Sequence, residues 1–189
     1  LGDGIESFWS VNSTDESKRY SKMALNLILK NGKAYLSNDM QGNQNMLKAA
    51  NIAGKAINIA QTTAGHAMSY KLTGLYGIAH GHAAALCTSK LWPYMLGHME
   101  NCCDKRGRKY LEYIFMEMAD TMGCRKVEEA ADFLQHLLSG MGLPIPKSSE
   151  KDYTILRASV NSVRLKNNPV QLSETAIDEL YRKILLGVK

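Results

Sequence analysis

The stretch that decides the fold is GHAMSYKLTGLYGIAHGHAAAL, residues 65–86, which contains three of the chain's five histidines. Glycines interrupt it between two segments of apolar, helix-forming residues, a pattern that predicts two helices joined by a tight turn. We expect residues 66–70 on the first helix and residue 80 onward on the second. His66, His80 and His82 then have two explanations. They are satisfied core histidines of a helical protein, or they converge on a ligand that needs imidazole.

The rest of the chain also has helical periodicity, with no sustained alternation of apolar and polar residues. No glycine-rich dinucleotide motif, no phosphate-binding loop and no succession of strand and helix is present in the sequence. The predicted fold class is all-α, a bundle of about seven to nine helices. Near the start, Ser13 or Thr14 caps a helix that we expect to end at Asn31-Gly32, before a polar stretch to about Gly42.

The amino-acid composition limits the classes of function that the chain can have. The chain has 189 residues, of which 45% are apolar and 22% charged, which is typical of one globular domain. Its net charge of +5 is scattered without a basic run, which argues against nucleic-acid binding. Charged residues interrupt the longest apolar segments, so no membrane span is expected. Four cysteines without a secretory pattern predict a reduced, cytoplasmic protein.

The five histidines do not all predict the same role. His66 and His80 lie on different predicted helices, and neutral imidazoles from two helices are typical ligands of a transition metal in a helical bundle. His82 lies two residues beyond His80, about 200° around the same helix, so it should point elsewhere. His98 and His136 are isolated on apolar helix faces and are predicted to be core histidines with one satisfied nitrogen.

Three segments resemble a known family. The segment AGKAINIAQTTAGHAMSYKLTGLYGIAHGHAAAL, residues 53–86, resembles the signature region of the iron-containing (group III) alcohol dehydrogenases. The segments IESFWSVNSTDES and RLKNNPVQLSETAIDELYRKIL resemble that family's first helix after the early metal ligands and its closing segment. The resemblance implies that residues 1–189 form one helical metal-binding domain, like the C-terminal domain of the dehydroquinate synthase-like fold. In this family the N-terminal half binds NAD(P).

The resemblance also implies a set of site residues. The family holds its metal through an Asp, a His four residues later, and two further histidines fourteen residues apart. His66 and His80 match that last spacing, and Asp3 stands where the family usually has its earlier His. The family's Asp would precede Leu1. The implied metal ligands are thus Asp3, His66 and His80, for Fe²⁺ or Zn²⁺. Tyr70 stands where many members carry a second active-site His, which implies a catalytic role.

The function implied is that of a metal-dependent alcohol dehydrogenase that interconverts an alcohol and an aldehyde or ketone with NAD(P). Its substrate would be a small alcohol or aldehyde. The chain begins without Met and with apolar residues already at helical spacing, so we expect a fragment whose partner is its own N-terminal nucleotide-binding domain. Alone, the fragment should fold but not catalyse. The oligomeric state is left open, a homo-oligomer being compatible with the sequence.

Two other functions stay open on the sequence. A dehydroquinate synthase-like lyase would use Zn²⁺ and NAD in the same architecture, with Lys71 as the one nearby cation for a phosphorylated substrate. A metal-free helical interaction domain would use the histidines only for packing. Metal content separates this interaction domain from the two enzymes, and aldehyde-dependent consumption of NAD(P)H separates the dehydrogenase from the lyase.

Overall fold

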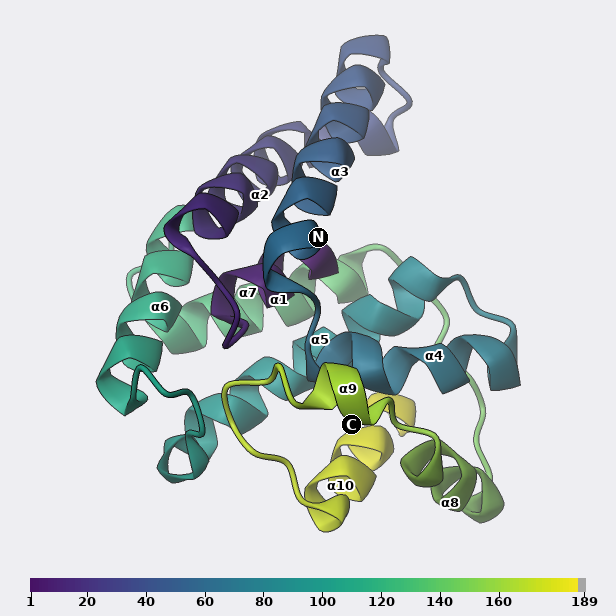
Figure 1. The fold of residues 1–189 in the computed structure, drawn as a ribbon. Helices are drawn as coiled ribbons and strands as arrows, with labels where there is room; N and C mark the ends of the chain where they lie inside the picture. Colours follow the sequence, from purple (N-terminus) through teal and green to yellow (C-terminus); the bar gives the residue numbers. More distant parts are fainter. Residues whose placement is uncertain (187–189) are drawn as a thin grey trace.

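A computed structural model describes residues 1–186, and within this range the chain is mainly helical and contains no strand (Figure 1). The all-α prediction is confirmed. The helices, more numerous than expected, are α1 Gly2–Trp9, α2 Asp15–Leu36, α3 Met40–Ala60, α4 Ala64–Tyr76, α5 His80–Gly97, the 3-10 helix η1 Met99–Asn101, α6 Arg108–Thr121, α7 Val127–Gly140, α8 Glu150–Ala158, α9 Ser162–Leu165 and α10 Glu174–Leu185.

Helices α4 and α5 confirm the prediction made from the histidine-rich stretch. Helix α4 ends at Tyr76 and is followed by Gly77, whose φ of 67° is left-handed and whose N–H donates to the carbonyl of Thr73. A glycine adopts this conformation without the steric cost that a Cβ carries, so the chain turns sharply there. His66 therefore lies in the first turn of α4, and His80 is the first residue of α5.

The predicted end of α2 is wrong. Thr14 and Ser17 form a capping box at its start, as expected, but the helix passes through Asn31-Gly32 and ends at Leu36. Asn31 donates to the carbonyl of Leu27 and accepts a hydrogen bond from Asn45 of α3, so its side chain joins two helices instead of breaking one.

The expected polar stretch before Gly42 is reduced to three residues, since α3 already begins at Met40. Gly42 lies inside this helix. A Cβ at Gly42 would come within 2.7 Å of the backbone of Ala34, so glycine allows the two helices to meet closely there. Tertiary contact between α2 and α3 thus overrides both local signals.

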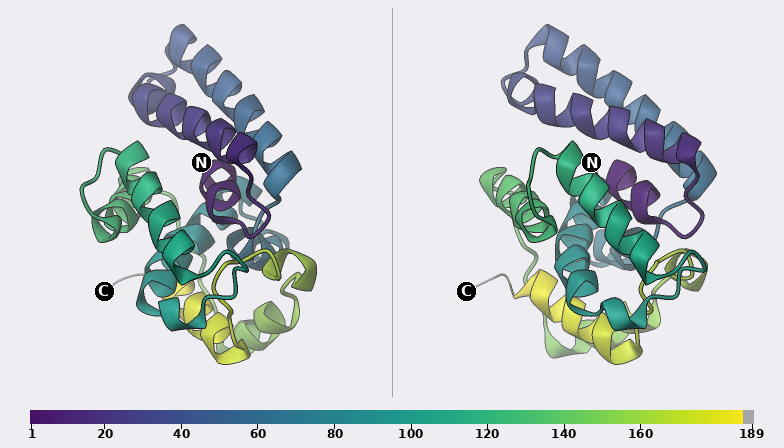
Figure 2. Two further views of the ribbon diagram at one scale, coloured as in Figure 1. Left: turned by 60° about the vertical axis from the view of Figure 1, so that its left-hand side comes forward. Right: turned by 90° about the vertical axis from the view of Figure 1, so that its left-hand side faces the viewer.

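Helices α2 and α3 form a long antiparallel hairpin, which we call the arm, and it projects from the other helices (Figure 2). The arm has its own small apolar cluster, built on Ala24, Ile52 and Ala53. The remaining helices share one larger core. Helix α1 lies where the arm meets this core and contacts α2, α3, α5 and α6. Trp9 of α1 is buried, with its ring centroid 5.7 Å from that of Trp92 in α5.

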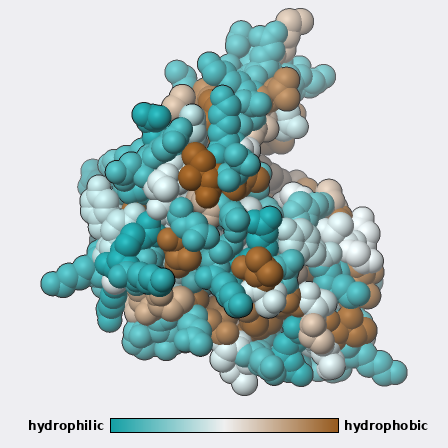
Figure 3. Space-filling view, viewed as in Figure 1, coloured by the Kyte–Doolittle hydropathy of each residue, from teal (hydrophilic) through white to brown (hydrophobic). Residues whose placement is uncertain are grey.

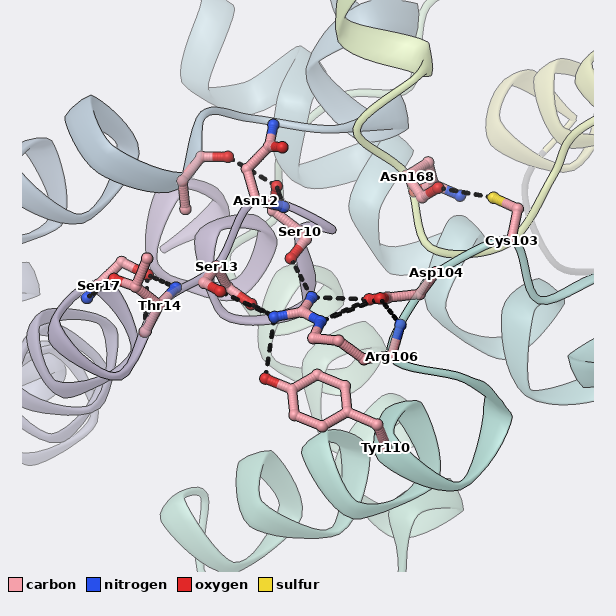
Figure 4. A network of polar contacts seen from close by, with 11 residues as sticks. Ser10, Asn12, Ser13, Thr14, Ser17, Cys103, Asp104, Arg106, Tyr110 and Asn168 are labelled. Carbon is pink, nitrogen blue, oxygen red and sulfur yellow. Dashed lines mark hydrogen bonds and ion pairs between the residues drawn. The ribbon is translucent and has the colours of Figure 1, made fainter.

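The segment after α1 is fixed by a polar network around Arg106 (Figure 4). The guanidinium donates to the Asp104 carboxylate at 2.7 Å and to the backbone carbonyls of Ser10 and Ser13 at 2.9 and 2.8 Å. It also lies over the ring of Tyr110, 4.2 Å from the centroid. These contacts join the α1–α2 connection to the segment before α6, and they anchor the helix that carries Asp3.

The face of the molecule seen in Figure 3 is mainly hydrophilic, with hydrophobic residues in separate small patches. Among the helices of residues 1–186, none combines the length and the apolar character that a membrane crossing requires.

Candidate metal centre

Two helices bring carboxylates and an imidazole together. Asp3 and Glu6 lie one turn apart on α1, at the spacing that places two side chains on one helix face. His66, in the first turn of α4, lies between them. Its Nε2 is 2.9 Å from Oδ1 of Asp3, and its Nδ1 is 3.2 Å from Oε1 of Glu6. The Nδ1 contact is close but poorly aligned, so this nitrogen lacks a well-formed hydrogen-bond acceptor within residues 1–186.

Glu6 is completely buried, yet its carboxylate is well solvated by protein groups. One oxygen accepts from the backbone N–H and the hydroxyl of Thr63, and the other accepts from the hydroxyl of Thr88 at 3.0 Å. Gly65 makes room for the carboxylate, because a Cβ there would lie 2.0 Å from Oε1 of Glu6. The buried charge is therefore compensated by directed hydrogen bonds, as a carboxylate inside a protein requires.

The two carboxylates determine the protonation of His66. Burial by itself lowers the pKa of His66, but the interactions with Asp3 and then Glu6 outweigh it and raise the pKa from 6.5 to about 9. The interaction with His66 in turn lowers the pKa of Asp3, against the opposing effect of burial. At neutral pH and without metal, the imidazole that lies between the carboxyl groups of Asp3 and Glu6 is thus protonated.

His80 lies beside this group on a more open side. Its ring centroid is 5.4 Å from that of His66, at an interplanar angle of 63°. The ring of Tyr70 stacks on His80 with a centroid distance of 5.4 Å and an angle of 7°. His80 is exposed, and 42% of Tyr70 is exposed. The structure therefore brings Asp3 and His66 into contact and places His80 and Tyr70 next to them.

The arrangement is not a closed ligand cage. In the part of the chain that the structure describes, no three His, Cys, Asp or Glu side chains form a group ready to hold a metal ion. The donor chemistry nevertheless fits a transition metal, since one carboxylate with two imidazoles is a known set for Fe²⁺. The buried Nδ1 of His66 lies 3.2 Å from a carboxylate oxygen of Glu6 and has no other partner among residues 1–186. This placement also fits a metal ligand, because ligating histidines usually donate their second N–H to such a group.

The other histidines have different surroundings. Nε2 of His82 is buried without a hydrogen-bond partner among residues 1–186, and burial lowers the pKa of this imidazole. His98 and His136 each have Nδ1 2.8 Å from the carbonyl four residues earlier, as a satisfied histidine should. Their predicted place in the core is wrong, since His98 is half-buried against Tyr94 and His136 is exposed.

Two adjoining cavities lie at this centre. The first has a volume of about 390 Å³ and is lined by Asp3, His66 and His80 together with Leu1, Gly2, Gly81, His82, Ala84, Ala85, Leu138, Met141 and Leu143. The second has about 470 Å³ and extends along α5 toward α7 and α10. Both share His82, Ala85, Leu138 and Leu143. A small molecule in the first cavity would meet three imidazoles and one carboxylate together with apolar side chains.

Sequence reasoning missed Glu6, Thr63 and Thr88, although a signal for one of them was present. Glu6 is an acidic residue within the apolar segment IESFW and lies three residues after Asp3, so it shares the face of α1 that carries the proposed ligand. No local pattern marks Thr88, because it reaches Glu6 from 82 residues away in the chain.

The fold and the centre together define an all-helical domain with a carboxylate–imidazole cluster at a cavity. Residues 3–185 match the model of the Fe-containing alcohol dehydrogenase family, C-terminal. Because the match covers nearly the whole chain, the chain belongs to this family and is its C-terminal domain.

Similar proteins agree with this assignment. The chain is 30% identical over 186 residues to a phosphonoacetaldehyde reductase from Streptomyces viridochromogenes, covering 95% of this chain and 46% of that protein. It is 27% identical to long-chain-alcohol dehydrogenase 1 from Geobacillus thermodenitrificans, covering 99% and 48%. The structure of sulfoacetaldehyde reductase from Bifidobacterium kashiwanohense in complex with NAD⁺ aligns with a TM-score of 0.82 and 25% identity, covering 97% and 47%. The chain thus spans about half the length of these relatives.

An iron-containing alcohol dehydrogenase from Thermococcus thioreducens shares the fold with a TM-score of 0.85 at 19% identity, covering 100% of this chain and 49% of that one.

Proposed function

We propose that this chain is the metal-binding half of an NAD(P)-dependent dehydrogenase that interconverts an alcohol and an aldehyde or ketone. The observation that carries the proposal is the contact of 2.9 Å between Asp3 and His66 at a cavity that His80 also lines. Membership of the Fe-containing alcohol dehydrogenase family supports it.

In this proposal Asp3, His66 and His80 hold the metal, either Fe²⁺ or Zn²⁺. When bound, such a metal supplies Lewis-acid polarisation of the substrate's carbon–oxygen bond. Asp3 adds a negative charge that compensates the cation, and His66 must release its Nε2 proton to serve as a ligand. The apolar residues that line the cavity leave fewer polar groups to hold water beside the metal, which would strengthen the electrostatic interactions there.

The remaining residues act on the substrate side. Tyr70 supports the ring of His80 by stacking and is the candidate for a further catalytic role. His82, with its unpartnered Nε2, lines both cavities and can hold a proton or a polar substrate group between them. We propose that the nicotinamide cofactor is positioned by a nucleotide-binding domain outside residues 1–189. The substrate class is a small alcohol or aldehyde, for which anionic aldehydes and longer alcohols are the first compounds to test, given the relatives' names.

The test uses the full-length protein that contains this chain. Elemental analysis of the purified protein should find about one Fe or Zn per chain. Consumption of NADH or NADPH should depend on an added aldehyde and stop after treatment with a chelator. A full-length protein that retains no metal under anaerobic purification with added Fe²⁺ or Zn²⁺, and that turns over no aldehyde, would overturn the proposal.

A further inference from the structure

The buried Glu6 lies behind the proposed ligand His66, on the side away from Asp3. We propose that Glu6 is a positioning residue that keeps the proton of His66 on Nδ1, so that Nε2 presents its lone pair to the metal. This inference rests on the proposed function, because it concerns the same site. It assigns to the carboxylate a role in metal affinity and not only in folding.

The fold buries the carboxylate of Glu6 at a cost in free energy. Burying a carboxylate is expensive unless its lone pairs accept hydrogen bonds. Three protein donors from Thr63 and Thr88 converge on Glu6, and Gly65 leaves the space for it. These groups account for most of its lone pairs. Oε1, which accepts a hydrogen bond from Thr88, therefore has a lone pair left, and it lies 3.2 Å from Nδ1 of His66.

The tautomers of the His66 imidazole connect Glu6 to metal binding. A neutral imidazole has one N–H and one lone pair, and an acceptor beside one nitrogen places the proton there. Without metal both nitrogens face a carboxylate, Nε2 that of Asp3 at 2.9 Å and Nδ1 that of Glu6 at 3.2 Å. When Asp3 binds the metal, Glu6 is the carboxylate that remains for the imidazole proton, so the proton stays on Nδ1 and Nε2 is the lone-pair nitrogen. Nε2 points toward Asp3 and the cavity, where the other proposed ligands lie. Although the Nδ1 contact is poorly aligned, Oε1 of Glu6 lies within hydrogen-bonding distance of it, at 3.2 Å.

The geometry also predicts which substitution reverses the effect. In Glu6→Gln the backbone N–H of Thr63 requires an oxygen opposite it, so the amide oxygen takes the place of Oε2. The amide NH₂ then takes the place of Oε1, where it donates to the hydroxyl of Thr88 and faces Nδ1 of His66. A donor at Nδ1 favours the proton on Nε2, which blocks that nitrogen as a ligand. The variant is nearly isosteric, so the local packing is retained.

The experiment measures Zn²⁺ affinity of the full-length protein by competition with a chelator, alongside circular dichroism. We expect Glu6→Gln to remain folded and to bind Zn²⁺ about 10- to 100-fold more weakly, the range typical of lost ligand-orienting partners. Glu128→Gln is the matched control. It makes the same side-chain change at an exposed position of α7, away from the centre, and its affinity should stay within about threefold of the wild type.

A folded Glu6→Gln variant with wild-type Zn²⁺ affinity would overturn the inference and leave the proposed function standing. A wild-type protein that binds neither Zn²⁺ nor Fe²⁺ would instead overturn the proposed function. If Glu6→Gln does not fold, ¹⁵N NMR of the Zn²⁺-loaded wild type decides. We expect His66 to carry its proton on Nδ1 with Nε2 coordinated, and coordination through Nδ1 would contradict the proposal.

Discussion

The two sides of the candidate metal centre differ in how firmly the fold holds them. On the α1–α4 side, His66 is 6% exposed and lies between two carboxylates, one of which is itself fixed by Thr63 and Thr88. On the α5 side, His80 is exposed at the start of its helix and is supported mainly by the stacked ring of Tyr70. One proposed ligand is thus part of the core, and the other is a surface residue beside it. Function should depend on both sides, whereas stability should depend on the first alone.

The largest expected effects come from removing either imidazole in the full-length protein. His66→Ala and His80→Ala should each abolish metal retention and lower kcat/KM by at least about 1000-fold, because several kcal/mol of Lewis-acid stabilisation are lost. Elemental analysis and aldehyde-dependent oxidation of NAD(P)H measure the two effects. His98→Ala, which changes a histidine satisfied by its own helix, should retain metal and activity. Metal and activity retained by His80→Ala would contradict the proposed site.

The same two variants should separate the sides by their stability. His66→Ala leaves the buried carboxylate of Glu6 without its cationic neighbour, so the free energy of unfolding at neutral pH should fall by about 3 kcal/mol. His80→Ala removes an exposed side chain and should change it by less than about 0.5 kcal/mol. Urea unfolding of both variants in the presence of a chelator provides the measurement. Equal losses of unfolding free energy in the two variants would contradict the stated difference between the two sides of the centre.

A methyl group can test the packing on the α1–α4 side. Gly65→Ala places a Cβ 2.0 Å from Glu6, so we expect a loss of about 2–3 kcal/mol in stability together with weaker metal binding. Gly74→Ala in the same helix is the matched control, since a Cβ there meets nothing within 4 Å. That variant should gain up to about 1 kcal/mol from better helix propensity. Thermal unfolding distinguishes the two, and a harmless Gly65→Ala would contradict the described burial of Glu6.

The pKa of His66 predicts a pH dependence of the metal-free protein. Its pKa is raised in the folded state from 6.5 to about 9, so folding favours the protonated imidazole. The resulting stabilisation is complete below pH 6.5 and is lost as the pH rises through about 9. The wild type should exceed His66→Ala in free energy of unfolding at about pH 6. We expect this difference to be about 2 kcal/mol smaller at about pH 9.5. Chelator-treated samples in urea provide the measurement, and a constant difference between the two proteins would contradict it.

The smallest effect is expected at Tyr70. Tyr70→Phe keeps the ring that stacks on His80, so metal content should be unchanged and kcat/KM should fall only a few-fold. A fall of about 100-fold or more would show instead that the phenol hydroxyl transfers a proton. Tyr70→Ala, which removes the ring, should weaken metal binding more than Tyr70→Phe does. Identical metal affinities in the two variants would exclude a supporting role for the stack.

Local signals explain which parts of the fold the sequence could predict. The turn between α4 and α5 depends on Gly77, whose left-handed backbone is a local property, and its prediction is confirmed. The continuation of α2 past Asn31 involves a hydrogen bond to that residue from Asn45, fourteen residues later in another helix. The predicted end of α2 is therefore wrong. A residue that looks like a helix terminator can continue a helix when a second helix satisfies its side chain.

The sequence by itself determined the all-α class, the two helices that carry His66 and His80, and the family, because these follow from periodicity, glycine positions and a long motif. Only the tertiary structure decided how the centre is built. It brings Asp3 to His66, buries Glu6 behind the imidazole and leaves His80 exposed on Tyr70. The physical reason is that burial and hydrogen bonding depend on groups that meet across helices. Thr88 stabilises Glu6 from α5, and no spacing within α1 could reveal that contact.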